Sequence, residues 1–287
     1  MPLRARVQSV ADPFIMGEVL RPDSSFNNAG NRDINAKTVR AGGLTINPAI
    51  RNLVLITAGQ SNYEAVAPSA YTPVNGGALD NINPYNGQMY VAADPLLSCT
   101  LALPSPYGPG GVSLRVADLL ITNGKFDRVI IVPIAIGGTV VAMWGTGGAL
   151  SNRIPAAMAR LASRGIVPGM SGVTFAFLWG QGESDAATGT APYVASINQV
   201  LASLFATGFN GRAWINLQTM LSGVTSATTR AAQSSGSVIT GNVFQGADAD
   251  SLNTTFRQAD QTHFLDTGMA SLATLIYNAM HATGAPY

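Results

Sequence analysis

The chain has 287 residues, of which 47% are hydrophobic and only 11% are charged, so a sizeable core is available to one large domain or two small ones. Lysine and arginine outnumber aspartate and glutamate by 16 − 15 = 1, which excludes the overall positive field that a nucleic acid or an anionic membrane surface requires. We therefore expect no nucleic-acid partner and no membrane partner.

The first 50 residues differ from the rest of the chain. Clusters of turn-forming residues occur at 22–25, 27–31 and 42–43, and the apolar residues show little periodicity. We predict an irregular arm or adaptor over residues 1–50, which attaches the protein to a larger assembly, and one domain over residues 51–287. No apolar run of secretory-signal length follows Arg4 and Arg6, so the chain as written has no Sec signal. Its polar, charge-poor composition nevertheless favours an extracellular or virion-associated protein over a cytoplasmic one.

From residue 52 the chain alternates between two apolar patterns. Short continuous runs rich in β-branched or aromatic residues suit strands buried on both faces of a parallel sheet, and apolar residues at helical spacing fall between them. This alternation predicts a doubly wound α/β sheet, in which ligands bind beyond the carboxyl ends of the strands. The predicted strands are 53–57, 129–134, 173–178 and 214–217, and the predicted helices lie within 112–120, 154–161, 194–204 and 267–281.

Two stretches need a separate interpretation. Residues 71–111 are rich in glycine, proline and asparagine and show no periodicity, which predicts a substrate-side loop or irregular packing. No residue between Arg128 and Arg153 is charged, but proline and several glycines interrupt this stretch. We therefore predict a buried strand that runs into a glycine loop, and no membrane helix.

Cysteine and histidine are too few for two common kinds of site. Cys99 is the single cysteine and the chain has two histidines, which excludes an internal disulfide and a histidine-rich zinc cluster. We expect Cys99 to be a small buried hydrophobic residue. We expect His281 to be exposed at the end of the last helix, beside the helix dipole.

Candidate chemical groups follow three of the predicted strands. Ser61 comes shortly after Gly59 at the end of the first strand, where it suits either a nucleophile or a helix N-cap. Gly137 and Gly138 follow the second strand and form either a plain turn or a pair of backbone donors for an oxyanion. After the third strand, residues 181–185 combine an amide, two carboxylates and a serine that are equally suited to capping the next helix.

A fourth candidate lies near the end of the chain. Asp260 precedes His263 by three residues, which places both on one side of a helical turn or tight loop. Asp260 can then bind the Nδ1 hydrogen and leave Nε2 free as a base, although such pairs are usually surface features. Each candidate alone is weak, but together they supply the groups that acyl transfer needs: a nucleophile, oxyanion donors, an amide and an acid-base pair.

The order and context of these segments resemble the SGNH hydrolase superfamily, and within it the carbohydrate esterase and sialate O-acetylesterase branch. Four blocks carry the resemblance: Gly59-Gln60-Ser61-Asn62; residues 133–139 with Trp144; Trp179-Gly180-Gln181-Gly182-Glu183-Ser184-Asp185; and Asp260 to His263 with Gly268. The resemblance spans residues 52 to about 282. It implies a flavodoxin-like three-layer α/β/α fold with a central parallel sheet, and ester hydrolysis without a metal or other cofactor.

The resemblance also implies a role for each candidate. Ser61 is then the nucleophile, His263 the general base and Asp260 its orienting acid, with Glu183 as a rival carboxylate. The oxyanion hole is formed by the backbone N–H groups of Ser61 and of Gly137 or Gly138, of which we favour Gly138, and by the side chain of Gln181. The implied substrate is an acetylated carbohydrate, since no obvious lid or apolar channel for a fatty acyl group is present.

Two other functions remain open from the sequence. One is a non-catalytic carbohydrate-binding or phage tail module that keeps the fold, which the polar composition and residues 1–50 suggest. The other is a short-chain lipase or thioesterase of the same superfamily, which differs in the acyl chain that it prefers.

Overall fold

The protein is described by a computed structural model over residues 46–97 and 108–282. Cys99 and residues 1–45 lie outside these ranges. The burial of Cys99 and the irregular arm therefore remain predictions. The described strands are β1 (Asn52–Gly59), β2 (Leu79–Ile82), β3 (Met89–Val91), β4 (Arg128–Pro133), β5 (Val173–Gly180), β6 (Arg212–Leu217) and β7 (Val243–Asp248). The described helices are α2 (Val112–Thr122), α3 (Arg153–Ala162), α4 (Thr190–Ala206), α5 (Ala227–Gln233) and α6 (Asp266–Met280).

The strands form one seven-stranded sheet in the order β3-β2-β4-β1-β5-β6-β7. All neighbouring pairs are parallel except β2 and β3, which form an antiparallel pair at one edge. Counted in chain order, β4, β1, β5, β6 and β7 follow the 2-1-3-4-5 order of flavodoxin-like folds. In such a sheet the ligand crevice lies beyond the carboxyl ends of β1 and its neighbours, where the direction of winding reverses.

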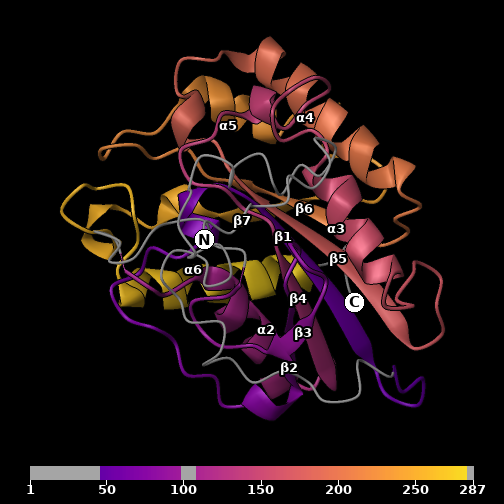
Figure 1. Ribbon diagram of the computed structural model, residues 1–287. Helices are drawn as coiled ribbons and strands as arrows, with labels where there is room; N and C mark the ends of the chain where they lie inside the picture. The colour runs from indigo at the N-terminus through magenta and orange to yellow at the C-terminus, as the bar shows by residue number, and fades with distance from the viewer. Residues whose placement is uncertain (1–45, 98–107, 283–287) are drawn as a thin grey trace, which may run out of the picture.

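Helices cover both faces of the sheet, which gives three layers (Figure 1). Side chains alternate along a strand, so Leu53 and Leu55 of β1 join the cluster under α2 and α6, while Val54 and Ile56 join the cluster under α3 and α4. The second cluster also contains Ile46, so the compact unit includes the last residues of the predicted arm. No helix within the described residues has the length and apolar content needed to cross a membrane.

The predicted α/β fold is confirmed, with corrections to its detail. All four predicted strands and all four predicted helices are present within a few residues. The sheet is mixed rather than purely parallel, because residues 71–111 contain β2 and β3 in place of a structureless loop. The short helix α5 and the strand β7 were not expected from the sequence.

Candidate active site

Three adjacent strands deliver the candidate groups to one edge of the sheet. β1 lies between β4 and β5, and the segments with Ser61, Gly138 and Gln181 follow the carboxyl ends of β1, β4 and β5. Gly59 allows this convergence: its φ is +126°, and a Cβ at this position would lie 2.0 Å from the carbonyl oxygen of Gly180. The chain can therefore turn sharply into the short 3-10 helix Ser61–Tyr63 only where no side chain is present.

Ser61, His263 and Asp260 form a continuous chain of hydrogen bonds. The Oγ atom of Ser61 lies 2.9 Å from Nε2 of His263, and Nδ1 of the same ring lies 2.5 Å from Oδ2 of Asp260. An ionised carboxylate only accepts hydrogen bonds, so Nδ1 carries the proton and Nε2 is left to accept the serine hydroxyl. Ser61 is 6% exposed and His263 9%, so both residues are shielded from solvent but not completely buried.

Asp260 is held in its ionised form by local hydrogen bonds. Burial by itself would raise the pKa of Asp260, but donors around the carboxylate outweigh it and hold the pKa below its usual value. Those donors are the His263 ring and the backbone N–H groups of Thr262 and His263, at 2.9 and 3.0 Å from Oδ1. The carboxylate thus stabilises the turn of residues 260–263 and also orients the imidazole of His263.

Groups from three other segments hold the turn that carries His263. Asn62 accepts the backbone N–H of Phe264 (3.2 Å) and donates to the carbonyl of Thr262 (3.3 Å). The same carbonyl accepts a hydrogen bond from the buried Arg257 guanidinium at 2.6 Å. From the loop after β6, Ser222 donates its backbone N–H to the hydroxyl of Thr262 at 2.8 Å. Asn62 and Arg257 were not predicted as site residues, although Asn62 lies in the Gly-Gln-Ser-Asn block.

The two glycines after β4 are not equivalent. The N–H of Gly137 donates to Oε2 of Glu64 at 2.7 Å. Gly138 is exposed, its φ is +71°, and a Cβ placed on it would meet nothing within 4 Å. Within the described residues, the structure gives no acceptor to the N–H groups of Gly138 and Ser61. These two donors are therefore available to a ligand, whereas that of Gly137 is not.

Gln60 and Gln181 lie in the interior between the strand ends. The Oε1 atom of Gln60 accepts hydrogen bonds from Gln181 Nε2 (3.2 Å) and from the backbone N–H groups of Gly182 and Ser184 (both 3.3 Å). The fully buried Gln181 amide also donates to the carbonyl of Thr139 (2.9 Å) and to the Asp185 carboxylate. Its hydrogens are engaged in this arrangement, so Gln181 can reach an oxyanion only by releasing one of these acceptors.

The rival carboxylate, Glu183, does not contact His263 by any hydrogen bond that the structure records. Its Oε1 accepts the side-chain amides of Asn62 and Gln218, both at 2.8 Å, while its Oε2 is buried without a hydrogen-bond partner. Burial raises the pKa of Glu183 to about 7, against the opposing effect of these two donors. Of the two candidate carboxylates, Asp260 is the one that meets the imidazole.

Other predicted features lie away from this edge. His281 is half-buried rather than exposed: Nδ1 lies 2.6 Å from the carbonyl oxygen of Tyr277, and the two rings pack 4.3 Å apart.

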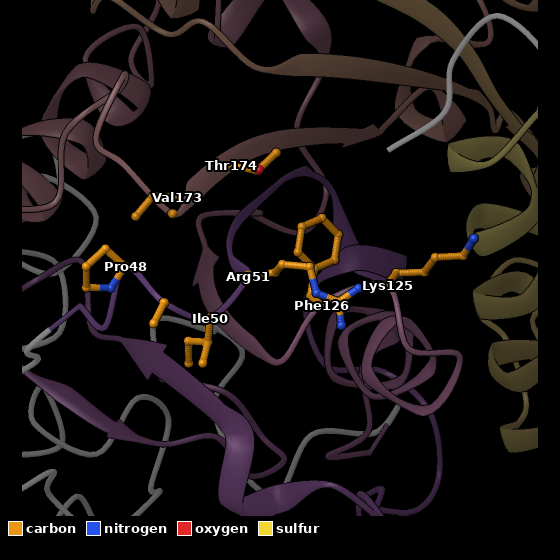
Figure 2. Close-up of a pocket in the computed structure, with 9 residues that line it drawn as sticks. Pro48, Ile50, Arg51, Lys125, Phe126, Val173 and Thr174 are labelled. Carbon is orange, nitrogen blue, oxygen red and sulfur yellow. The ribbon is translucent and has the colours of Figure 1, made fainter.

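A cavity of about 420 Å³ lies at the opposite edge of the sheet, where β1, β4 and β5 begin. Figure 2 shows Arg51, Phe126 and Val173 among the residues around it. The length of β1, roughly 25 Å at the usual rise of a strand, separates it from Ser61.

Comparisons with known proteins identify the family and support the fold. The profile of the family described as "Carbohydrate esterase, sialic acid-specific acetylesterase" matches residues 51–282. A solved protein from Arabidopsis thaliana is 16% identical, with a TM-score of 0.55 over 80% of this chain and 97% of its own. The solved structure of NanS is also 16% identical, with a TM-score of 0.51 over 80% and 96%. A search of curated proteins found no match.

The family match covers most of the chain and includes every candidate site residue, and the two solved structures share the fold. The protein is a carboxylic ester hydrolase of the carbohydrate esterase class. It belongs to the carbohydrate esterase, sialic acid-specific acetylesterase family.

Proposed function

We propose that the protein removes O-acetyl groups from a carbohydrate by serine catalysis, with Ser61 as nucleophile, His263 as general base and Asp260 as the acid that orients it. One observation carries this assignment: the hydrogen-bond chain from Ser61 Oγ through both ring nitrogens of His263 to Asp260. A nucleophile, a base and an orienting acid in this relation define the catalytic triad in unrelated folds.

The reaction follows from these groups. His263 Nε2 takes the proton of the Ser61 hydroxyl as Oγ attacks the acetyl carbonyl, and Asp260 stabilises the imidazolium that forms. The tetrahedral intermediate collapses when His263 returns the proton to the departing sugar alcohol, which leaves an acetyl group on Ser61. Water, deprotonated by His263, then attacks this ester and releases acetate.

The negative charge of the intermediate is stabilised by an oxyanion hole in this proposal. The backbone N–H groups of Ser61 and Gly138 are its two donors, and a donor of this kind contributes a factor of about 10² to 10³ to kcat. Gln181 serves as a third donor only if its amide leaves Thr139 or Asp185 when substrate binds. Until then it braces the loops after β1, β4 and β5.

An acetylated carbohydrate is the proposed partner, and the small net charge argues against a nucleic acid or a membrane surface. We also propose that residues 1–50 attach the esterase domain to a larger assembly, outside the cell or on a phage particle, as the polar composition suggests. A carbohydrate-binding module without activity and a short-chain lipase or thioesterase are the alternatives that the experiment must exclude.

The test is acetate release from acetylated sugars and from p-nitrophenyl esters of increasing chain length. The variants Ser61→Ala and His263→Ala are expected to lose several orders of magnitude in kcat/KM, as loss of a triad member generally does. His281→Ala is the matched control, since its ring packs against Tyr277 far from Ser61, and it should keep the parent rate. A folded parent that releases no acetate would contradict the proposal, and a preference for long acyl chains would favour a lipase.

A further inference from the structure

Glu64 is a buried carboxylate at this edge that the proposed reaction does not use. It follows the short helix Ser61–Tyr63 directly, and its own backbone N–H donates to the carbonyl of Ser61 at 3.0 Å. Only 3% of Glu64 is exposed. Its side chain crosses from the end of β1 to the loop after β4, where Oε2 accepts the N–H of Gly137 at 2.7 Å. Glu64 thus connects the segment of Ser61 to the glycine loop.

The glycine loop needs such a connection to act as a donor site. Two consecutive glycines have no side chains to limit their backbone angles, so they sample more conformations than any other pair. A hydrogen bond to the N–H of Gly137 restricts the peptide that joins Ile136 to Gly137. The N–H of Gly138 follows that peptide by one residue and has no acceptor within the described part of the chain. The direction of this free N–H therefore depends on the contact between Glu64 and Gly137.

We propose that Glu64 is a positioning residue for the oxyanion hole. It accepts the N–H of Gly137 so that the N–H of Gly138 faces the carbonyl that Ser61 attacks. Glu64 lies only three residues after Ser61, and its side chain reaches the loop after β4. This one side chain therefore sets the distance between the proposed nucleophile and the N–H donor of Gly138. This inference rests on the proposed esterase activity and assigns a role to a residue that none of the four sequence blocks contains.

A near-isosteric pair of variants isolates the proposed contact. Glu64→Gln keeps an oxygen that accepts the N–H of Gly137, while Glu64→Met has a similar length and no oxygen, so it fills the space without the hydrogen bond. Both variants remove the charge, and they differ in the amide group of Gln, whose oxygen is the acceptor for the N–H of Gly137. Asp118→Leu is the control, since Asp118 is a buried carboxylate that accepts the N–H groups of Val74 and Asn75 and hydrogen-bonds none of the proposed site residues.

The measurement is kcat and KM for an acetyl ester, on samples shown to be folded by thermal melting. A donor that acts on the oxyanion stabilises the transition state more than bound substrate. Glu64→Met is therefore expected to lower kcat by about 10- to 100-fold with little change in KM, since part of one donor's contribution is lost. Glu64→Gln and Asp118→Leu should stay within about fivefold of the parent kcat, which is well below the loss of one donor.

Amide hydrogen exchange gives a second readout that does not depend on activity. The N–H of Gly137 should be protected in the parent and in Glu64→Gln, and should exchange faster in Glu64→Met. An unchanged kcat in folded Glu64→Met would overturn the inference, as would an equal loss in the Gln and Met variants. Ser61→Ala is measured in the same series: if it stays active, the proposed function fails, whereas its inactivity beside an active Glu64→Met refutes only the role of Glu64.

Discussion

Two acidic segments lie at the same edge of the sheet, and they use their carboxylates in opposite ways. In residues 260–263, the Asp260 side chain is 33% exposed and contacts the imidazole of His263. In residues 181–185, Glu183 and Asp185 are almost completely buried and accept hydrogen bonds from amides and backbone N–H groups. The first carboxylate contacts the proposed general base, while the other two hold the surrounding loops in place.

The environment of each carboxylate accounts for the difference. Around Asp260, several donors outweigh a partial burial, so its pKa lies below the usual value. Around Glu183, complete burial outweighs two amide donors, so its pKa rises to about 7. A carboxylate within one of the sequence blocks can therefore be the weaker candidate for a catalytic role, because burial and nearby donors decide which carboxylate remains charged.

The largest loss of kcat is expected from replacing Asp260, and the same change at Glu183 should have a much smaller effect. Asp260→Asn is expected to lower kcat for p-nitrophenyl acetate by about 10³- to 10⁴-fold, because an amide favours the wrong imidazole tautomer. Glu183→Gln is the matched change and should cost less than about tenfold, since a Gln oxygen still accepts the Asn62 and Gln218 amides. The opposite ranking of the two variants would assign the orienting role to Glu183.

A smaller effect is expected where the two segments meet. Asn62 donates both to Glu183 and to the carbonyl of Thr262, and it accepts the N–H of Phe264. Asn62→Ala removes the contacts on both sides of His263, so we expect kcat to fall by about 10- to 100-fold through loss of alignment.

Asn52, the first residue of β1, provides the control for this variant. Its buried side chain donates to the carbonyls of Asn47, Ile50 and Gly172 at the opposite edge of the sheet. Asn52→Ala should lower the melting temperature and leave kcat of the folded enzyme unchanged. Equal losses of kcat in the two variants would show that Asn62 acts only through general stability.

The two carboxylates should also give stability profiles of opposite slope. The pKa of Glu183 rises from 4.5 to about 7 on folding, so the folded state keeps a proton that the unfolded chain releases. Stability then falls as pH rises through that window, and Glu183→Gln should remove a decline on the order of 1–3 kcal/mol. Urea unfolding of the parent and of Glu183→Gln at pH 5 and pH 8 measures this change in the free energy of unfolding. The same pH dependence in both proteins would contradict the prediction.

For Asp260 the sign is reversed, and the effect is the smallest of the series. Its pKa is lowered on folding, so its contribution to stability is present above the unfolded pKa of about 4 and is lost as pH falls through the lower folded value. Asp260→Asn should therefore make unfolding less sensitive to acid than in the parent. Thermal melting between pH 3 and pH 6 compares the two, and a steeper acid loss in the variant would argue against this role.

The fold could be predicted where strands are buried on both faces, since such strands appear as continuous apolar runs in the sequence. β2 was missed because its Leu-Asp-Asn-Ile segment is polar. It is nevertheless buried, because Asp80 pairs with Arg128 of β4 and Asn81 accepts the N–H of Leu97. β7 was missed because it lies at the edge of the sheet and four of its six residues keep some exposure. In both cases the partners come from elsewhere in the chain.

The sequence by itself determined the alternating α/β architecture and the short set of candidate site residues, because strand ends and local motifs are encoded within a few neighbouring residues. Only the tertiary structure decided how those residues pair. It placed Asp260 rather than Glu183 against His263. It also paired the N–H of Gly137 with Glu64, and the N–H of Gly138 remained available. Such choices depend on burial and on contacts between distant segments.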